Sequence, residues 1–531
     1  MPKELSTEQD LPLALLMDRN GYQLDPQKPL GRQSAGASFL EAYLRFSRNK
    51  LHSIAVANHN EATWFHQQAK KLHPQSTTRA VKVQNWGDAG KASGAFHVPD
   101  PRLDNWAWKR MPWGDGAFSL IGLVHTLCSY NVQHSLGQIS SSPLRNWDAL
   151  ICTSKAAKQA VTGFLERQEE WIHQRHRGSQ FERPLLPVIP LGIHSENWQR
   201  ADENNIETSK RARKDLGISP IAEVVLVAGR LDILTKMQPA PLLRALGELK
   251  QDTHPNLELL VYGEAPNPDM HDLWVKGIKQ LVPELPIHWI PGRKVQLASK
   301  VRWAADIFVS LSDNPQETFG ITPLEAMAAG LPCIVSDWDG YRDTVIQPGE
   351  SEPATGFRIP TRLVEGLGKE QAHYLLQDAI SFDLAVGQIS QGIAVDLAIF
   401  KKATSTLLSN PELRASMSAA GQKRVQQNYS WHVVIEQWRS LVLELQKRRL
   451  HARLSGQTIP PQLPPWLQDT SISFGCFASQ VLPAGWAPKT PDPEVEASCL
   501  DNPFQSWDVS LLKNDSARRR GWWLKNGLVE P

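Results

Sequence analysis

Two glutamates with seven residues between them form the most informative pattern in the sequence. Glu317 and Glu325 lie in the segment 312–340, which reads SDNPQETFGITPLEAMAAGLPCIVSDWDG. A carboxylate accepts two hydroxyl protons, as vicinal sugar hydroxyls require. Gly320 lies between the glutamates, just before an expected helix, and lets the backbone approach a ligand closely. The free N–H groups and dipole of such a helix attract phosphate, so a ribose, a diphosphate and a hexose would fit this segment.

A structural explanation of Glu325 is equally good from spacing alone. The pattern predicts a short helix over Leu324–Gly330, with Thr322 as its N-cap and Pro323 at its first position. Glu325 follows Thr322 by three residues, which is the spacing of a capping box. The carboxylate would then stabilise the helix end and bind no ligand.

Short apolar runs alternate with helical patterns through most of the chain, and they predict the scaffold for these residues. The expected strands of the first half are Leu11–Met17, His52–Asn58, Ala80–Val83, Ser119–Leu127, Leu150–Thr153 and Leu186–Ile189. Those of the second half are Glu223–Ala228, Leu257–Tyr262, His288–Pro291, Ile307–Leu311 and Cys333–Ser336. Repeated βα units predict an α/β fold with two parallel sheets, which bind ligands at the carboxyl ends of their strands.

Three further segments are set apart by composition. The polar stretch Glu196–Lys214 is either a link between domains or, equally, a solvated surface helix. Residues 401–449 have a helical pattern, with a helix start at Asn410-Pro411. From Leu454 onward the chain is rich in Pro, Trp and Ser, which favours an extended tail or one that wraps over a lobe rather than a domain.

Composition excludes several classes of protein. The 531 residues carry 57 Lys and Arg against 55 Asp and Glu, and this balance argues against nucleic acid as a partner. No apolar run reaches the roughly 18–20 residues of a membrane span. The first ten residues have no signal-peptide pattern, and the five cysteines form no CxxC pair. We therefore expect a reduced, cytoplasmic, multidomain enzyme.

The 312–340 segment resembles the E-x7-E motif of glycosyltransferase family 4, a large retaining group with the GT-B fold. Other motifs of this family occur in order over about residues 11–450. They are the interdomain Pro190-Leu191-Gly192-Ile193, Ala228-Gly229-Arg230-Leu231 with Lys236, Val261-Tyr262-Gly263-Glu264, the nucleobase loop Pro291-Gly292-Arg293, the strand 304–309, and Asn428-Tyr429-Ser430-Trp431 before a final helix.

The resemblance implies a GT-B fold, in which two Rossmann-like lobes face a donor-binding cleft. Residues 1–200 would form the N-terminal lobe on the acceptor side, and residues 215–428 the C-terminal lobe that binds the nucleotide sugar. A helix at 429–450 would cross back to the first lobe, and 451–531 would be a Pro/Trp-rich tail.

The resemblance also implies roles for individual residues. Arg230 and Lys236 would neutralise the leaving diphosphate. Glu317 would hold the donor sugar, and Glu325 the ribose hydroxyls. The other donor-binding residues would be Gly36, Gly292, Arg293, Phe319, Gly320, Ile321 and Thr322.

Two residues of the first lobe have competing explanations. His125 resembles the histidine that faces the donor sugar in this family, although a histidine at the end of an apolar strand is more often structural. Gly36 closes the segment GRQSAG, which resembles the family's glycine-rich loop near the diphosphate. An ordinary loop between a strand and a helix explains that segment equally well.

The implied activity is that of a retaining hexosyltransferase. It would move a sugar from a nucleotide-diphosphate donor to a hydroxyl of a glycan, a lipid or a small molecule, without a metal or another cofactor. Fixed cations aimed at the diphosphate would stabilise the transition state, and removing one such group typically costs about 3–4 kcal/mol.

Other signals are weaker. Asp337-Trp338-Asp339 could hold a divalent cation, but polar contact with the acceptor fits its position better. Residues 105–113, NWAWKRMPW, are candidates for acceptor contact. The basic segments 447–453 and 518–525 could contact an anionic membrane at the inner face, although a solvated face or a docked tail fits each better.

Two rival functions stay open at this stage. A nucleotide-sugar epimerase or hydrolase would share the two-lobe fold but would lack an acceptor site. A non-catalytic scaffold would bind sugar nucleotides or glycans and recruit partners through its tail. The combination of Glu317 and Glu325 with Arg230 and Lys236 argues against the scaffold, because a scaffold has no use for cations at a leaving group.

Overall fold

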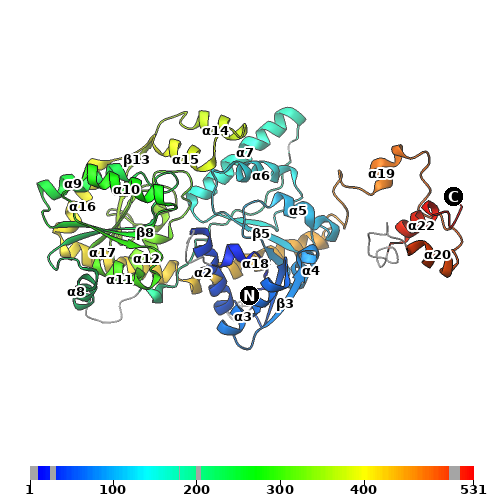
Figure 1. Ribbon diagram of the computed structural model, residues 1–531, viewed down its shortest axis with the longest axis horizontal. Coiled ribbons are helices and arrows are strands. Elements are labelled where there is room, and N and C mark those ends of the chain that lie inside the picture. Colours follow the sequence, from blue (N-terminus) through cyan, green and yellow to red (C-terminus); the bar gives the residue numbers. More distant parts are fainter. Residues whose placement is uncertain (1–9, 24–30, 179, 199–204, 502–514, 531) are drawn as a thin grey trace. The chain divides into compact units, whose positions relative to one another are not determined.

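The computed structural model describes residues 10–23, 31–178, 180–198, 205–501 and 515–530 (Figure 1). Contacts between residues divide the chain into two compact units, residues 1–462 and 463–531. The first unit contains two parallel six-stranded sheets, so the prediction of an α/β fold with two Rossmann-like lobes is confirmed.

The N-terminal lobe is built on a parallel sheet in the order β3-β2-β1-β4-β5-β6. Its strands are β1 Ala14–Met17, β2 Leu51–Val56, β3 Thr77–Lys82, β4 Ala95–His97, β5 Ser119–Leu123 and β6 Ala149–Ile151. Its helices include α1 Arg19–Tyr22, α2 Gly31–Phe46, α3 His59–Leu72, α4 Trp86–Ser93, α5 Asp104–Arg110, α6 Tyr130–Gln138 and α7 Lys155–His176. Separate apolar clusters cover the two faces of the sheet.

The C-terminal lobe repeats this plan with the strand order β12-β11-β10-β7-β8-β9. Its strands are β7 Glu223–Arg230, β8 Leu257–Glu264, β9 Ile287–Pro291, β10 Ile307–Ser310, β11 Cys333–Ser336 and β12 Gly356–Ile359. Val224 and Leu226 face one apolar cluster and Val225 and Val227 the other, because alternate side chains of a strand point to opposite faces. The apolar runs therefore correspond to central strands that are buried on both faces.

Helices and a small hairpin complete the C-terminal lobe. The helices are α8 Asn205–Leu216, α9 Pro239–Asp252, α10 Pro268–Leu281, α11 Ala298–Ala304, α12 Ile321–Ala328, α13 Tyr341–Thr344, α14 Lys369–Leu376, α15 Phe382–Ser390, α16 Leu397–Ser409 and α17 Pro411–Asn428. Strands β13 Thr361–Leu363 and β14 Ile393–Val395 pair antiparallel. The side chain of Asn410 accepts a hydrogen bond from the N–H of Leu413, which confirms the predicted helix start.

The long helix α18, Trp431–Leu454, follows the C-terminal lobe but packs on the N-terminal lobe (Figure 1). Trp431 and Trp438 are buried there, and both rings contact Phe39 of α2. The N–H of Ile193 donates to the carbonyl oxygen of Tyr429 at 2.8 Å, so the connection after the first lobe and the start of α18 run side by side.

Several predictions about connecting segments were wrong. The expected strand Leu186–Ile189 forms only an isolated bridge, between Val188 and Cys152, and Leu185 just before it bridges Ala149 of β6. Residues 205–214 of the polar stretch 196–214 belong to α8, so the surface-helix alternative is correct there. Residues 199–204 of that stretch lie outside the described residues.

The tryptophan-rich segment 105–113, predicted as a candidate for acceptor contact, forms α5 and a short 3-10 helix, and two of its tryptophans pack into the lobe. The rings of Trp106 and Trp113 lie edge-on to the buried Trp86, in the apolar cluster of the N-terminal lobe. Arg110 of the same segment is fully buried and forms a two-pronged ion pair with Asp148. This segment therefore stabilises the lobe.

The second unit contains the helices α19 Thr470–Phe474, α20 Pro493–Leu500 and α22 Ser516–Lys525. Trp522 and Trp523 are buried against Cys499 and Leu500, and Arg519 pairs with Glu496. The prediction of an extended tail is therefore wrong for these helices, and the two tryptophans of the basic segment pack within their own unit. No helix in the described ranges is long and apolar enough to cross a membrane.

Candidate active site

Two loops at the carboxyl ends of neighbouring strands bring Lys236 and Glu317 together. One loop follows β7, and the other joins β10 to α12. The Nζ atom of Lys236 donates to the Oε2 atom of Glu317 across 81 residues of sequence. Both side chains are largely buried but keep some exposure, 21% for Lys236 and 13% for Glu317.

The β10–α12 loop also holds the backbone of the β7 loop in place. The side-chain amide of Asn314 donates to the carbonyl oxygen of Lys236 at 2.7 Å, and Ser312 Oγ donates to the same oxygen at 3.2 Å. The N–H of Gln238 donates to the carboxylate of Asp313 at 3.1 Å. Hydrogen bonds to the main chain of Lys236 hold its loop, and the bond to Glu317 holds its ammonium. The position of the ammonium is therefore fixed at both ends of the side chain.

The electrostatics keep this pair ionised. Burial opposes ionisation of Glu317, but Lys236, the N–H of Phe319 and Arg230 together hold its pKa below the usual value. Burial also opposes the charge of Lys236, and Glu317 raises its pKa in spite of this. Arg230 ends β7 and lies 4.0 Å from Asp232, so two cations stand at this strand end.

Helix α12 begins beside this pair, and its first turn differs from the prediction. Gly320 is the N-cap, with φ +83°, and the helix starts at Ile321. Thr322 therefore lies inside the first turn, and its Oγ1 atom is buried with no hydrogen-bond partner among the described residues. The predicted capping box is wrong, because Thr322 does not cap and Glu325 bonds elsewhere.

Glu325 points from α12 toward α11, where its Oε2 atom accepts a hydrogen bond from Arg302. Burial raises the pKa of Glu325, and the guanidinium of Arg302 partly offsets this. The Glu325 side chain keeps 18% exposure, so a ligand can still reach it.

The predicted nucleobase loop lies close to Glu325. Tyr262 of β8 donates its hydroxyl proton to the carbonyl oxygen of Gly292 at 3.2 Å, and its ring lies 5.9 Å from the guanidinium of Arg302. Arg293 points to solvent and pairs with Glu264 at 2.5 Å. Gly292 is thus linked to Glu325 through Tyr262 and Arg302.

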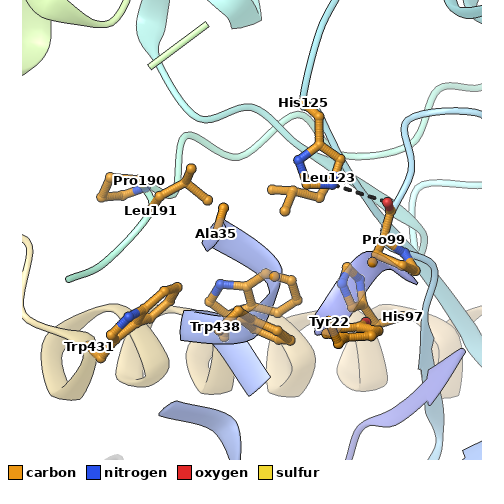
Figure 2. A pocket seen from close by; sticks show the side chains of 13 residues that line it. Tyr22, Ala35, His97, Pro99, Leu123, His125, Pro190, Leu191, Trp431 and Trp438 are labelled. Carbon is orange, nitrogen blue, oxygen red and sulfur yellow. Dashed lines mark hydrogen bonds between the residues drawn. The ribbon is translucent and has the colours of Figure 1, made fainter. Parts of the chain in front are cut away.

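The two candidate residues of the N-terminal lobe, Gly36 and His125, line one small apolar pocket (Figure 2). The other lining residues are Gly21, Tyr22, Ala35, Phe39, His97, Pro99, Leu123, Pro190, Leu191, Trp431 and Trp438. His125 Nε2 donates to the carbonyl oxygen of Pro99 at 3.1 Å, a bond that Figure 2 shows as a dashed line.

The loop predicted at Gly31–Gly36 is the first part of helix α2. Gly36 has a packing reason for being glycine, since a Cβ atom there would lie 2.0 Å from the carbonyl oxygen of Gly21. The segment is therefore neither the predicted glycine-rich loop nor an ordinary loop between a strand and a helix, because the helix begins at Gly31.

Hydrogen bonds join the two lobes beside the site. Thr318 Oγ1, next to Glu317, donates to the carbonyl oxygen of His125 at 3.0 Å, and Thr153 Oγ1 donates to that of Thr318 at 3.1 Å. Ser154 Oγ donates to the carboxylate of Asp339 at 2.7 Å. The candidate residues of both lobes therefore face one another.

Asp339 makes the stability of this junction depend on pH. Burial raises its pKa to about 7, against the Ser154 hydrogen bond, and the charges of Glu317 and Asp343 raise it further. The folded protein therefore holds this proton where the unfolded chain releases it. The free energy of unfolding should fall between about pH 4 and pH 7, by at most about 4 kcal/mol from this group.

Asp339→Asn should remove this decline, and asparagine suits the positive φ of 41° at this position. We expect urea denaturation to show a larger gain in stability for Asp339→Asn over wild type at pH 8 than at pH 5. An equal difference at the two pH values would show that Asp339 is ionised in the folded protein throughout.

The other aspartate of the D-x-D sequence is engaged by arginines. Asp337 Oδ1 lies 3.3 Å from Arg358 and 3.6 Å from Arg342. Within the described ranges, no three His, Cys, Asp or Glu side chains are arranged to hold a metal ion.

Sequence comparison places this site within a known family. Residues 208–380 match the family model described as "Glycosyl transferases group 1". This segment is a group 1 glycosyltransferase domain. It contains both cations, both glutamates and the loop at Gly292, whereas Gly36 and His125 lie outside it.

Curated relatives and a solved structure extend the similarity. The chain is 26% identical over 337 residues to D-inositol 3-phosphate glycosyltransferase of Corynebacterium efficiens, which covers 61% of this chain and 66% of that protein. It is 24% identical over 322 residues to alpha-maltose-1-phosphate synthase of Mycobacterium tuberculosis, covering 58% and 72%. The first relatives are thus matched over about half to two thirds of their length.

The structure of Anabaena Alr3699/HepE in complex with UDP and glucose superposes with a TM-score of 0.50 at 16% identity, covering 84% of this chain and 99% of that one. At this identity the likeness shows the fold alone. The group 1 domain therefore belongs to a chain with the GT-B arrangement of two lobes.

Several side chains that shape the site lie outside the sequence motifs. Tyr341 is fully buried, bonds Ser310 at 2.7 Å and lies against Gly320. Arg302 pairs with Glu325, and the ring of Trp198 stacks on Arg302, and both residues lie outside the motifs. Their signal in the sequence is weak, although Arg302 follows Ala298 by four residues and so lies on the buried face of α11, where a charged residue requires a partner.

Proposed function

We propose that this protein is a glycosyltransferase that moves a sugar from a nucleoside-diphosphate sugar to an acceptor hydroxyl. The observation that carries the proposal is the juxtaposition of Lys236 and Glu317 with the start of α12, in a group 1 glycosyltransferase domain. The solved structure with UDP and glucose belongs to a protein of the same fold, which supports a sugar nucleotide as donor.

The chemistry follows from the charges. Breaking the bond between the anomeric carbon and the phosphate oxygen leaves positive charge on the sugar and negative charge on the diphosphate. Lys236, Arg230 and the N–H groups at the start of α12 would stabilise that negative charge, as fixed cations and dipoles do in other active sites. Glu317 would then accept hydroxyls of the donor sugar, and Glu325 those of the ribose.

The acceptor hydroxyl would attack the anomeric carbon on the face that the diphosphate leaves, with its proton passing to the departing phosphate oxygen. This step retains the configuration of the sugar. His125 and Gly36 line the pocket on the opposite lobe, where the donor sugar would meet the acceptor. No metal is needed in this scheme, because side-chain cations balance the charge of the leaving group.

The direct test is an assay of nucleotide release. UDP-, GDP- and ADP-sugars are incubated with the protein, with and without extracts that contain glycans and lipids. Release that depends on an acceptor, together with a labelled glycosylated product, supports the proposal. Conversion of the donor to an isomeric sugar nucleotide, or release at the same rate without acceptor, would overturn it in favour of an epimerase or hydrolase.

Glu325→Gln should weaken binding of the nucleotide while the fold survives. The amide oxygen can still accept from Arg302, but the charged acceptor for the ribose hydroxyls is lost. A hydrogen bond to a charged group contributes about 1.5–3 kcal/mol, so we expect roughly a 10- to 100-fold rise in the dissociation constant by calorimetry.

A matched control is Glu258→Gln, which changes another glutamate of the same lobe that pairs with His288 at 2.7 Å. This variant should bind the nucleotide like wild type. If Glu325→Gln binds as tightly as Glu258→Gln, the carboxylate does not hold the ribose.

A further inference from the structure

Arg302 is a buried charge in the donor lobe that no motif accounts for. It lies on α11, and its side chain is 2% exposed. One guanidinium nitrogen donates to the carbonyl oxygen of Ala298 at 2.9 Å, and another donates to Glu325. A buried cation needs a partner, and Glu325 is the carboxylate that pairs with it.

Aromatic rings fix the plane of this guanidinium. The ring of Trp198 lies 4.2 Å from the central carbon of the Arg302 guanidinium, and the ring of Tyr262 lies at 5.9 Å. Such stacking over rings suits the planar guanidinium of arginine better than the ammonium of lysine. The remaining nitrogen, Nε, is buried and has no hydrogen-bond partner among the described residues.

This contact involves only one oxygen of Glu325. Arg302 reaches Oε2 with a single nitrogen, and the Glu325 side chain keeps 18% exposure. The carboxylate is therefore held by one edge on the α11 side, and the helix that carries it begins beside Lys236 and Glu317. An ionised carboxylate held in this way can accept further hydroxyl protons with its other oxygen.

We propose that Arg302 is a positioning residue of the donor site, which orients Glu325 to accept the ribose hydroxyls of a nucleoside diphosphate. This inference rests on the proposed function. Burial raises the pKa of Glu325, and the guanidinium of Arg302 opposes that rise, so the same contact favours the ionised carboxylate. A purely structural ion pair would stabilise the lobe without any effect on ribose recognition.

The test compares UDP, GDP and ADP with their 2′-deoxy forms by calorimetry. Wild type should bind at least one ribonucleotide about 10-fold more tightly than its 2′-deoxy form, the ratio expected for one hydrogen bond to a charged group. In Arg302→Met, this ratio should fall to near one. The variant should also bind more weakly at pH 6 than at pH 8, because Glu325 without Arg302 takes up a proton more readily.

Arg213→Met is the matched control. Arg213 of α8 donates to the carbonyl oxygen of Ala304 at 2.9 Å and pairs with Asp306 at 2.8 Å in the same lobe, so its carboxylate partner is not Glu325. Loss of Arg213 should lower the melting temperature. The ratio of affinities for the ribonucleotide and its 2′-deoxy form should stay at the wild-type value. Arg302→Lys, which keeps the charge, covers the case that Arg302→Met does not fold, and it should restore the pH profile but only part of the ratio.

The positioning role would be overturned if a folded variant, Arg302→Met or Arg302→Lys, distinguished the ribonucleotide from its 2′-deoxy form as well as wild type does. The proposed function would then stay in place. A wild-type protein that binds none of the three nucleotides would overturn both. In the background of Glu325→Gln, Arg302→Met should cause no further loss of ribose discrimination, and a further loss would show that Arg302 acts by another route.

Discussion

Lys236→Met should lower the rate of sugar transfer about 100- to 1,000-fold, the loss typical when one preorganised group that stabilises developing charge is removed. The structure gives the reason, because the ammonium of Lys236 is held between Glu317 and the start of α12. Its main-chain carbonyl oxygen is bonded by Asn314 and Ser312, so methionine should leave the loop in place. Steady-state kinetics with the active donor would measure the effect on kcat and on kcat/KM.

Lys250→Met controls for the loss of a lysine in the same lobe. Lys250 donates to the carbonyl oxygens of Pro255 and Leu257, at the amino end of β8, whereas the candidate site lies at the carboxyl ends of the strands. It should transfer sugar at the wild-type rate. Turnover of folded Lys236→Met within a factor of about three of wild type would remove the leaving-group role of this side chain, since the expected loss is far larger.

Gly320→Ala should strongly destabilise the donor lobe. A Cβ atom at Gly320 would lie 2.0 Å from the ring of the buried Tyr341. The φ of +83° costs a residue other than glycine about 1–2 kcal/mol, and displacing a packed ring adds about 1–3 kcal/mol. We expect the free energy of unfolding to drop by about 2–5 kcal/mol and activity to fall with it, because Gly320 begins α12.

Gly217→Ala separates the two causes. Gly217 has a similar φ of +70°, but no atom lies within 4 Å of the position that a Cβ atom would take there. Denaturant titration should show a loss of only about 1–2 kcal/mol for Gly217→Ala. Equal losses for the two variants would mean that Tyr341 moves away without cost and that Gly320 is needed only for its backbone angle.

The fold could be predicted from the sequence because its signal is local and repeated. The apolar run at 223–228 and the strand at 333–336 are explained by burial on both faces of a parallel sheet. The interaction between Lys236 and Glu317 could be anticipated only through the family resemblance, since 81 residues separate them. The family resemblance placed Lys236 and Glu317 at the same site. The structure adds the hydrogen bonds that hold the two residues together.

Other features could not be read from spacing. Thr322 and Glu325 satisfy the capping-box pattern, yet Arg302 competes for the glutamate, and that contact depends on how α11 packs against α12. The segment Gly31–Gly36 has a loop-like composition but begins a helix, and Gly36 is accounted for by its close packing against Gly21. In both cases a tertiary contact outweighed a local preference.

The central claim is that a nucleoside diphosphate binds at the start of α12. A crystal structure of the protein with the diphosphate that binds best would test it most directly. We expect the two phosphates beside Gly320 and Thr322, with the ammonium of Lys236 and the guanidinium of Arg230 in contact with their oxygens. Phosphates bound on another face of the donor lobe, with Lys236 still paired only to Glu317, would contradict the account.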